Sequence, residues 1–299
     1  MTSLTTALDI LTLAGIYGLY ACGLTLIFGV LEVLNLAHAP TFAFAAVAAM
    51  YLVTDRGLPL PAACIVAVLA SGVIAVLVDR IAFRTLRYRG QTAWGKHIGP
   101  LMTSLAAATI LQSLAQGWFG IDARNFPNKL LPAGSLAVGG VDVSFTSLLA
   151  VVVFIVAMVA MAGLLRYTRW GLEIRGVAER AETTALFGVD AERRIMEAML
   201  LAGLLAGLAG IAWSLSFNIA GPATGEQLNI KGFALIVLGG MGSVPGAVIG
   251  ALVIAATEVL GVLWLPSGMQ ELIVFAVFFL LLVFRPQGIL GRPISRGAR

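Results

Sequence analysis

The sequence predicts an all-α, polytopic integral membrane protein with about eight or nine transmembrane helices, some of them broken or re-entrant. The first observation behind this is composition: 60% of the 299 residues are hydrophobic and 11% are charged, whereas a soluble domain carries about 25% charged residues. The second is that the apolar residues form long continuous runs. A water-soluble globule and a disordered chain are therefore excluded, and the net charge of only +4 argues against a nucleic-acid partner.

The apolar runs predict the helices one by one. Several runs exceed about 18 residues, enough for a helix to cross about 30 Å of hydrocarbon. Two shorter runs, 40–54 and 228–242, predict tilted, re-entrant or broken helices that lie among the others. In chain order, the runs are 8–31, 40–54, 60–79, 98–118, 145–165, 195–217, 228–242, 246–264 and 269–284.

The basic residues predict the orientation of these helices. Fifteen of the nineteen Lys and Arg residues lie in the segments 80–97 and 166–194 and in the C-terminal tail. The positive-inside rule places these segments in the cytoplasm. Three crossings precede residue 80, so the N-terminus is expected outside. The loop near residue 220 is external and the tail is cytoplasmic, so an odd number of crossings, one or three, must lie between them. The total number of crossings is therefore left open.

Two loops complete the predicted layout of a single domain, residues 1–299. The segment 119–144 is rich in Gly, Pro and Asn and predicts an external loop with a short hairpin. The cytoplasmic segment 166–194 contains an amphipathic stretch, in which Gly188 suits a helix C-terminus and Asp190 an N-cap. This stretch is either a helix lying on lipid or a docking helix for a cytoplasmic partner. Its mixed charge favours docking.

Two interruptions of the apolar pattern are candidates for a substrate path. One lies at residues 33–40 and the other at 239–246, where Gly and Pro free backbone groups that need polar partners. Breaks in both halves of a transporter often mark its substrate site. The candidate path residues are Asn35, His38, Gly240 and Ser243. The alternative is that the breaks are tight turns, with Asn35 and His38 only capping helix ends.

No pattern in the sequence indicates an enzyme, a metal site or a bound cofactor. The segment Gly90 to Lys96 begins like a phosphate-binding loop, but His97 stands where Ser or Thr should hold magnesium. Cys22 and Cys64 lie in apolar stretches and suggest buried hydrophobes. The carboxylates Asp9, Glu32, Asp79 and Glu258 each lie near the end of an apolar run, which argues against proton coupling.

Five segments, taken together, resemble the branched-chain amino acid ABC-transporter permeases, and among them the LivH-type subunit. The resemblance runs from about Leu13 to Pro293, and it is the order and spacing of the segments that make it specific. One departure is that Ala39 and Pro40 follow His38, where family members commonly have Gly and an acidic residue. The segments are Gly18–Val30, Asn35–His38, Gly188–Arg193, Leu238–Ala247 and Phe284–Arg292.

The resemblance implies a permease subunit of an ATP-driven importer for branched-chain amino acids or related small polar or amide solutes. The implied partners are a second, LivM-type permease, two cytoplasmic ATPases that bind ATP and Mg, and an extracytoplasmic binding protein. The implied location is a bacterial inner membrane, in contact with its lipid. The segment 173–188 matches the ATPase-docking loop, with Glu179, Arg180, Glu182, Leu186 and Gly188 as contact residues. The alternative is a self-sufficient channel or secondary transporter, which has no need of such a loop.

Overall fold

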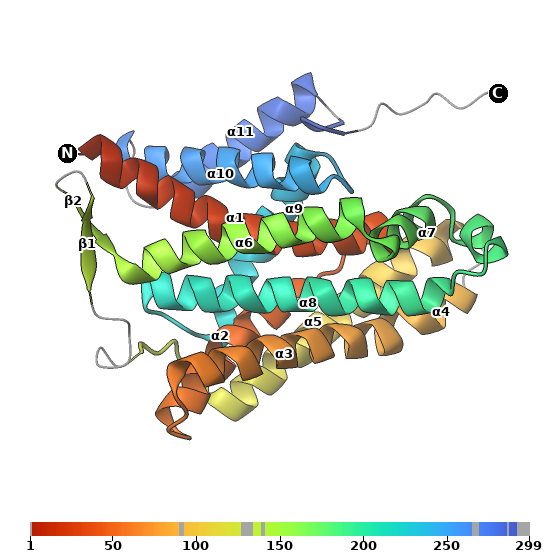
Figure 1. The fold of residues 1–299 in the computed structure, drawn as a ribbon, viewed down its shortest axis with the longest axis horizontal. Helices are drawn as coiled ribbons and strands as arrows, with labels where there is room; N and C mark the ends of the chain where they lie inside the picture. The colour runs from red at the N-terminus through yellow and green to blue at the C-terminus, as the bar shows by residue number, and fades with distance from the viewer. Residues whose placement is uncertain are drawn as a thin grey trace.

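The protein is a bundle of long helices that run roughly side by side (Figure 1). Its structure, a computed structural model, describes residues 2–89, 93–126, 134–138, 141–264, 269–285 and 287–291. Three residues of the segments discussed above lie outside the described residues. They are Gly90, in the segment that begins like a phosphate-binding loop, and Pro286 and Arg292, in the segment Phe284–Arg292.

Helices make up most of the described chain, and a two-stranded antiparallel hairpin is its only sheet. The short hairpin predicted within the segment 119–144 is thus present, and the external position of that segment stays a prediction. The elements in order are α1 (Thr2–Leu31), α2 (His38–Thr54), α3 (Leu60–Val78), the π-helical turn η1 (Asp79–Phe83), α4 (Arg84–Arg89), α5 (Ala93–Phe119), β1 (Ser135–Val138), β2 (Val141–Ser144), α6 (Phe145–Tyr167), α7 (Arg169–Leu186), α8 (Ala191–Phe217), the 3-10 turn η2 (Pro222–Gly225), α9 (Glu226–Gly239), α10 (Val244–Trp264) and α11 (Gln270–Phe284).

Six helices of the described chain are long and apolar enough to cross a membrane, and two shorter apolar helices, His38–Thr54 and Glu271–Phe284, accompany them. The short runs predicted at 40–54 and 228–242 are α2 and α9. The 14 residues of α9 extend only about 21 Å, less than the hydrocarbon core. Three helices, α9, α10 and α11, follow residue 220 in the described chain, and of these α10 alone is long and apolar enough to cross a membrane.

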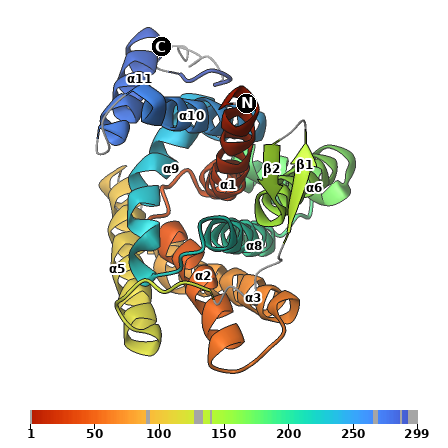
Figure 2. The ribbon, with the colours of Figure 1, turned by 90° about the vertical axis from the view of Figure 1, so that its left-hand side faces the viewer.

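The centre of the bundle is formed by α1 and α8. Seen end-on, these two helices are surrounded by α2 and α3 on one side, α10 and α11 on another, and α6 on a third (Figure 2). The spanning part of α1 is almost completely buried, whereas that of α6 is mostly exposed. The glycines of α8 permit close packing: a Cβ at Gly203 would lie 2.6 Å from the carbonyl oxygen of Ser71. Gly203 of α8 therefore packs closely against α3 within the chain.

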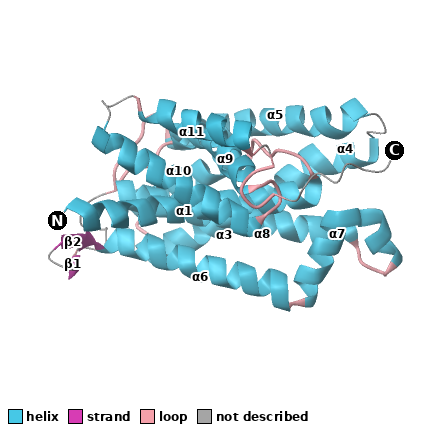
Figure 3. Cartoon of the chain, turned by 90° about the horizontal axis from the view of Figure 1, so that it is seen from above, coloured by secondary structure: helices cyan, strands magenta, loops and turns pink. Residues whose placement is uncertain are grey.

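The predicted external loop and the predicted cytoplasmic segments lie at opposite ends of the bundle. The N-terminus of α1 and the β1–β2 hairpin lie at one end, and α7 and α4 lie at the other (Figure 3). The loop 119–126 belongs to the hairpin end, because Arg124 and Ala220 exchange backbone hydrogen bonds of 2.9 Å. The predicted external and cytoplasmic segments are thus at opposite ends.

At Asp79 the end of an apolar run does not mark the end of a helix. Asp79 ends an apolar run, yet the helix continues beyond it through η1 and α4. The carboxylate is buried and lies 2.7 Å from the Arg87 guanidinium, which also contacts Glu192 of α8 at 3.1 Å. A buried charge is tolerated where an opposite charge pairs with it, so the end of the apolar run does not end the helix.

Candidate functional site

The first break, between α1 and α2, is closed by polar contacts inside the protein. The Asn35 Oδ1 accepts a hydrogen bond from the Ala37 N–H at 3.0 Å. The Ser104 hydroxyl of α5 lies 3.4 Å from the Leu36 nitrogen and 3.3 Å from the Leu34 oxygen. Backbone groups freed by the break are therefore satisfied by side chains, as membrane depth requires.

His38, the first residue of α2, is wedged against α1. It is 1% exposed, and its Nε2 lies 3.2 Å from the carbonyl oxygen of Tyr20. A carbonyl oxygen only accepts, so Nε2 carries the hydrogen and donates it. A Cβ at Gly23 would lie 2.9 Å from the His38 ring. The missing side chain at Gly23 thus makes the space that His38 occupies.

The second break, between α9 and α10, is closed by the C-terminal segment. Gly240 and Gly242 have φ values of 101° and 80°, which favour glycine. The Ser243 Oγ accepts from the Gly246 N–H at 3.2 Å and so caps α10. The carbonyl oxygens at the end of α9 accept from the tail: Leu238 from the Ile289 N–H at 2.8 Å and Gly239 from the Leu290 N–H at 3.0 Å.

Both breaks lie beside the last turns of α1. Gly242 is packed against Gly29, where a Cβ on Gly29 would lie 3.7 Å from the Gly242 Cα. The first break, residues 33–40, begins four residues after Gly29. The structure therefore brings the two breaks against the C-terminal half of α1, through His38 at Gly23 and Gly242 at Gly29. The polar atoms of the four candidate path residues are engaged in caps and backbone contacts, and a direct role in the path stays a prediction.

Loss of the Asn35 hydrogen bond should lower stability by about 1–3 kcal/mol, because Asn35→Ala leaves the buried Ala37 N–H without its acceptor. Asn35→Asp keeps an acceptor oxygen and should restore stability. Thermal unfolding of the purified complex, measured beside uptake in vesicles, checks this. A transport loss in Asn35→Ala that exceeds its stability loss indicates a role in the path. A loss fully explained by stability indicates capping alone.

The predicted docking segment forms α7 and the turn that follows it. The helix is interrupted at Arg180, whose φ and ψ of −157° and 99° are not helical, and Thr184 folds back over Gly176. All five predicted contact residues, Glu179, Arg180, Glu182, Leu186 and Gly188, are exposed. Leu186 and Phe187 are 86% and 84% exposed. Gly188, with a φ of 81°, follows the helix end as expected, and Asp190 accepts from the Arg193 N–H as the N-cap of α8.

The base of α7 is fixed to α8 by ion pairs and hydrogen bonds. The Arg194 guanidinium lies 2.5 Å from Glu173 of α7 and 2.6 Å from Glu197. The Trp170 indole N–H donates to Glu197 at 2.7 Å. The buried side chains of Ile174 and Val177 add apolar contact. The base of α7 is therefore fixed to the central helix of the bundle, and the exposed tip lies beyond the interruption at Arg180.

Sequence reasoning missed a charge pair inside the bundle. Lys231 of α9 lies 2.8 Å from Glu258 of α10, and the hydroxyl of Tyr17 on α1 donates to the other oxygen of Glu258 at 2.8 Å. The sequence shows only that Lys231 lies within the apolar run 228–242 and Glu258 within the next run, 246–264. It could not show that the two side chains meet.

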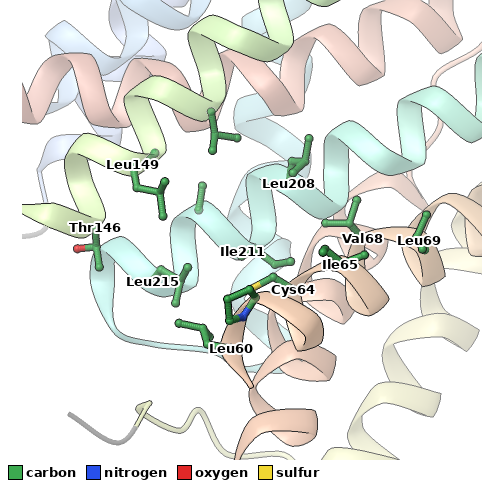
Figure 4. Close-up of a pocket in the computed structure, with 14 residues that line it drawn as sticks. Leu60, Cys64, Ile65, Val68, Leu69, Thr146, Leu149, Leu208, Ile211 and Leu215 are labelled. Atoms are coloured by element: carbon green, nitrogen blue, oxygen red, sulfur yellow. The ribbon is translucent and has the colours of Figure 1, made fainter. Parts of the chain in front are cut away.

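A cavity between α3, α6 and α8 has a different character. It holds about 390 Å³ and is lined by apolar side chains, among them Ile65, Leu149, Ile211 and Leu215 (Figure 4). Among the residues that line this cavity, only Cys64 and Thr146 have a sulfur or oxygen atom in the side chain. A small polar solute needs placed polar groups, so this cavity suits a hydrocarbon chain and not a charged substrate.

Comparison with known proteins matches the chain to one family. The family model "Branched-chain amino acid transport system / permease component" matches residues 6–282. The high-affinity branched-chain amino acid transport system permease protein BraD of Pseudomonas aeruginosa is 28% identical over 295 residues, which cover 95% of this chain and 94% of BraD. The corresponding permease protein LivH of Escherichia coli K12 is 30% identical over 298 residues, covering 94% of this chain and 93% of LivH.

Proposed function

The chain belongs to the permease-component family of branched-chain amino acid transport systems, and we propose that it forms half of the translocation path of an ATP-driven importer. The proposed substrates are branched-chain amino acids or related small polar solutes. The observation that carries the proposal is α7, which is fixed to the bundle at its base and presents exposed Leu186 and Phe187 at its tip. A channel or secondary transporter does not need such a surface.

The proposed complex has four kinds of partner. Two cytoplasmic ATPases bind ATP and Mg, which this chain does not bind. A second, LivM-type permease supplies the other half of the path, and an extracytoplasmic binding protein delivers the substrate. The exposed apolar helices of the bundle, such as α6, suit lipid or the second permease. Exposed apolar residues beside charges on α7 suit a protein groove with a polar rim.

Coupling runs through α8 in this proposal. Movement of the ATPases displaces α7, and the contacts of Glu173 and Trp170 transmit the displacement to the start of α8. On the other side, Glu192 of α8 contacts Arg87 and Arg84 at 3.1 and 3.3 Å. The breaks that hold Asn35, His38, Gly240 and Ser243 lie beside α1, which packs on α8. We place these four residues along the path, where they fix the backbone of the breaks.

The proposed orientation has the hairpin end outside and α7 and the C-terminus in the cytoplasm. It is supported by the basic residues of α4 and α7, two helices that lie at the same end of the bundle. With Cys64 replaced, Arg180→Cys should resist a membrane-impermeant maleimide in intact cells and react in inverted vesicles. Asp122→Cys, in the loop at the hairpin end, is the matched control and should react in intact cells. Rapid labelling at position 180 from outside would contradict the orientation.

Reconstitution tests the function itself. A tagged chain should co-purify with two ATPase subunits and a second permease. In proteoliposomes, leucine uptake should require the binding protein on one side and ATP on the other. Uptake by the chain alone, driven by an ion gradient or by the leucine gradient, would instead indicate the secondary transporter or the channel.

A further inference from the structure

The contact among Lys231, Glu258 and Tyr17 joins three helices inside the bundle. The Lys231 ammonium lies 2.8 Å from the Glu258 Oε1 and 3.5 Å from the Tyr17 hydroxyl oxygen. The Tyr17 hydroxyl donates to the Glu258 Oε2 at 2.8 Å. The side chains of Lys231 and Glu258 are 7% and 17% exposed. Both oxygens of the carboxylate are therefore bound, and both charges are largely removed from solvent.

Stability alone gives no reason for this pair. Removing two charges from water costs several kcal/mol per ion, and apolar side chains of similar volume are often as stable or more so. Ionisable residues inside a membrane protein are accordingly rare and commonly mark substrate or ion pathways. The pair of Lys231 and Glu258 is thus a candidate for a direct role in transport.

The pair lies in the half of the bundle that faces the hairpin end. Lys231 is about 8 Å along α9 from its start at Glu226. That start follows the segment 218–220, where the Asn218 side chain accepts from the Phe126 N–H and Ala220 pairs with Arg124. Under the proposed orientation this is the external side. Glu226 contacts Gln112 of α5 there, so polar groups continue from the outer end toward Lys231.

An aromatic surface lies next to the charges. The rings of Tyr17 and Trp213 stack with centroids 6.4 Å apart, and Trp213 contacts Phe217 at 4.3 Å and Phe42 at 6.4 Å. The Trp213 indole N–H is buried and has no hydrogen-bond partner among the described residues. A positive and a negative group beside an apolar aromatic surface match a ligand with both charges and an apolar side chain.

We propose that Lys231 and Glu258 form a charge clamp for a zwitterionic amino acid on its passage through the outer half of the path. The substrate carboxylate takes the place of Glu258 at Lys231, and the substrate ammonium takes the place of Lys231 at Glu258. One ion pair becomes two, so the clamp opens without leaving a buried charge unpaired. Tyr17 continues to hold the Glu258 carboxylate, and the aliphatic side chain rests on Tyr17 and Trp213. This inference rests on the proposed function.

The test replaces both charges at once. Lys231→Met with Glu258→Leu removes the pair without leaving one buried charge alone, so the complex should assemble with its ATPases and keep its thermal midpoint. Leucine uptake in proteoliposomes should fall about tenfold or more, because hydrogen bonds to charged groups contribute about 1.5–3 kcal/mol each. Thr257→Val is the control, since the Thr257 hydroxyl donates to the Val253 carbonyl oxygen of its own helix, and it should transport normally. Normal uptake by the double variant overturns the clamp.

A second measurement uses the unaltered complex and so does not depend on how the variant folds. Leucine at saturating concentration, without the binding protein, should raise the thermal midpoint of the complex. Leucinamide and 4-methylpentanoate, which each lack one charge, should not. Equal shifts with all three compounds, or none with leucine, overturn the clamp. If the unaltered complex takes up no zwitterionic amino acid, the proposed function fails and the clamp fails with it. Normal uptake with an unaffected double variant rejects the clamp alone.

Discussion

Leu186→Asp should abolish ATP-driven uptake while the chain remains folded and inserted. Leu186 and Phe187 are adjacent apolar side chains at the tip of α7, and both are more than four-fifths exposed. In a groove of an ATPase they would be desolvated, and truncation of such anchors commonly costs about 2 kcal/mol or more of binding. A carboxylate at this position adds the cost of burying an unpaired charge. Co-purification of the ATPases and uptake by vesicles measure the loss.

The control for this change keeps the apolar surface. Leu186→Met has a similar volume and should retain both ATPase binding and uptake. Because the exposed side chain makes no contact that holds the bundle together, the yield and thermal midpoint of the isolated chain should be equal in the two variants. Retention of the ATPases by Leu186→Asp, with normal uptake, would show that another part of the chain forms the docking surface.

Features set by neighbouring residues were predictable from the sequence. The end of α7 near Gly188 and the Asp190 N-cap depend on local conformation and one short hydrogen bond, and both are found. The short helices α2 and α9 follow from the lengths of their apolar runs. The hairpin before residue 144 follows from the glycines around it. Each of these depends on residues within a few positions of one another.

Features set by contacts between distant residues were not predictable in this way. The pairing of Lys231 with Glu258 joins two separate helices, and the closure of the second break by residues 289 and 290 joins two segments about 50 residues apart. Asp79 remains inside a helix because Arg87 pairs with it. The interruption of α7 at Arg180 accompanies a contact between Thr184 and Gly176. The pattern of apolar runs does not show which residues of different helices will contact each other.

The glycines of α8 include one contact that their spacing predicts and one that it does not. Their spacing at Gly203 and Gly207 predicts close helix packing, and a Cβ at Gly207 would lie 2.8 Å from the Ser71 hydroxyl oxygen. The spacing does not reveal Gly210, where a Cβ would overlap the carbonyl oxygen of Phe42 on α2. That oxygen belongs to helix backbone, which cannot move aside as a flexible side chain can. The contact fixes how closely α8 approaches the helix that begins at His38.

Gly210→Val should therefore destabilise the bundle by about 3 kcal/mol or more, because overpacking of a close helix contact forces the backbones apart. With total stabilities of about 5–15 kcal/mol, we expect a large loss of folded protein in the membrane and of the thermal midpoint in detergent. Gly163→Val on α6 is the matched control: beyond the backbone of its own helix, no described atom lies within 4 Å of the position that a Cβ would take there, and its effect should stay within about 0.5 kcal/mol. Fluorescence-detected size exclusion after stepwise heating compares the two variants. Equal midpoints would mean that α8 does not pack on α2 through Gly210.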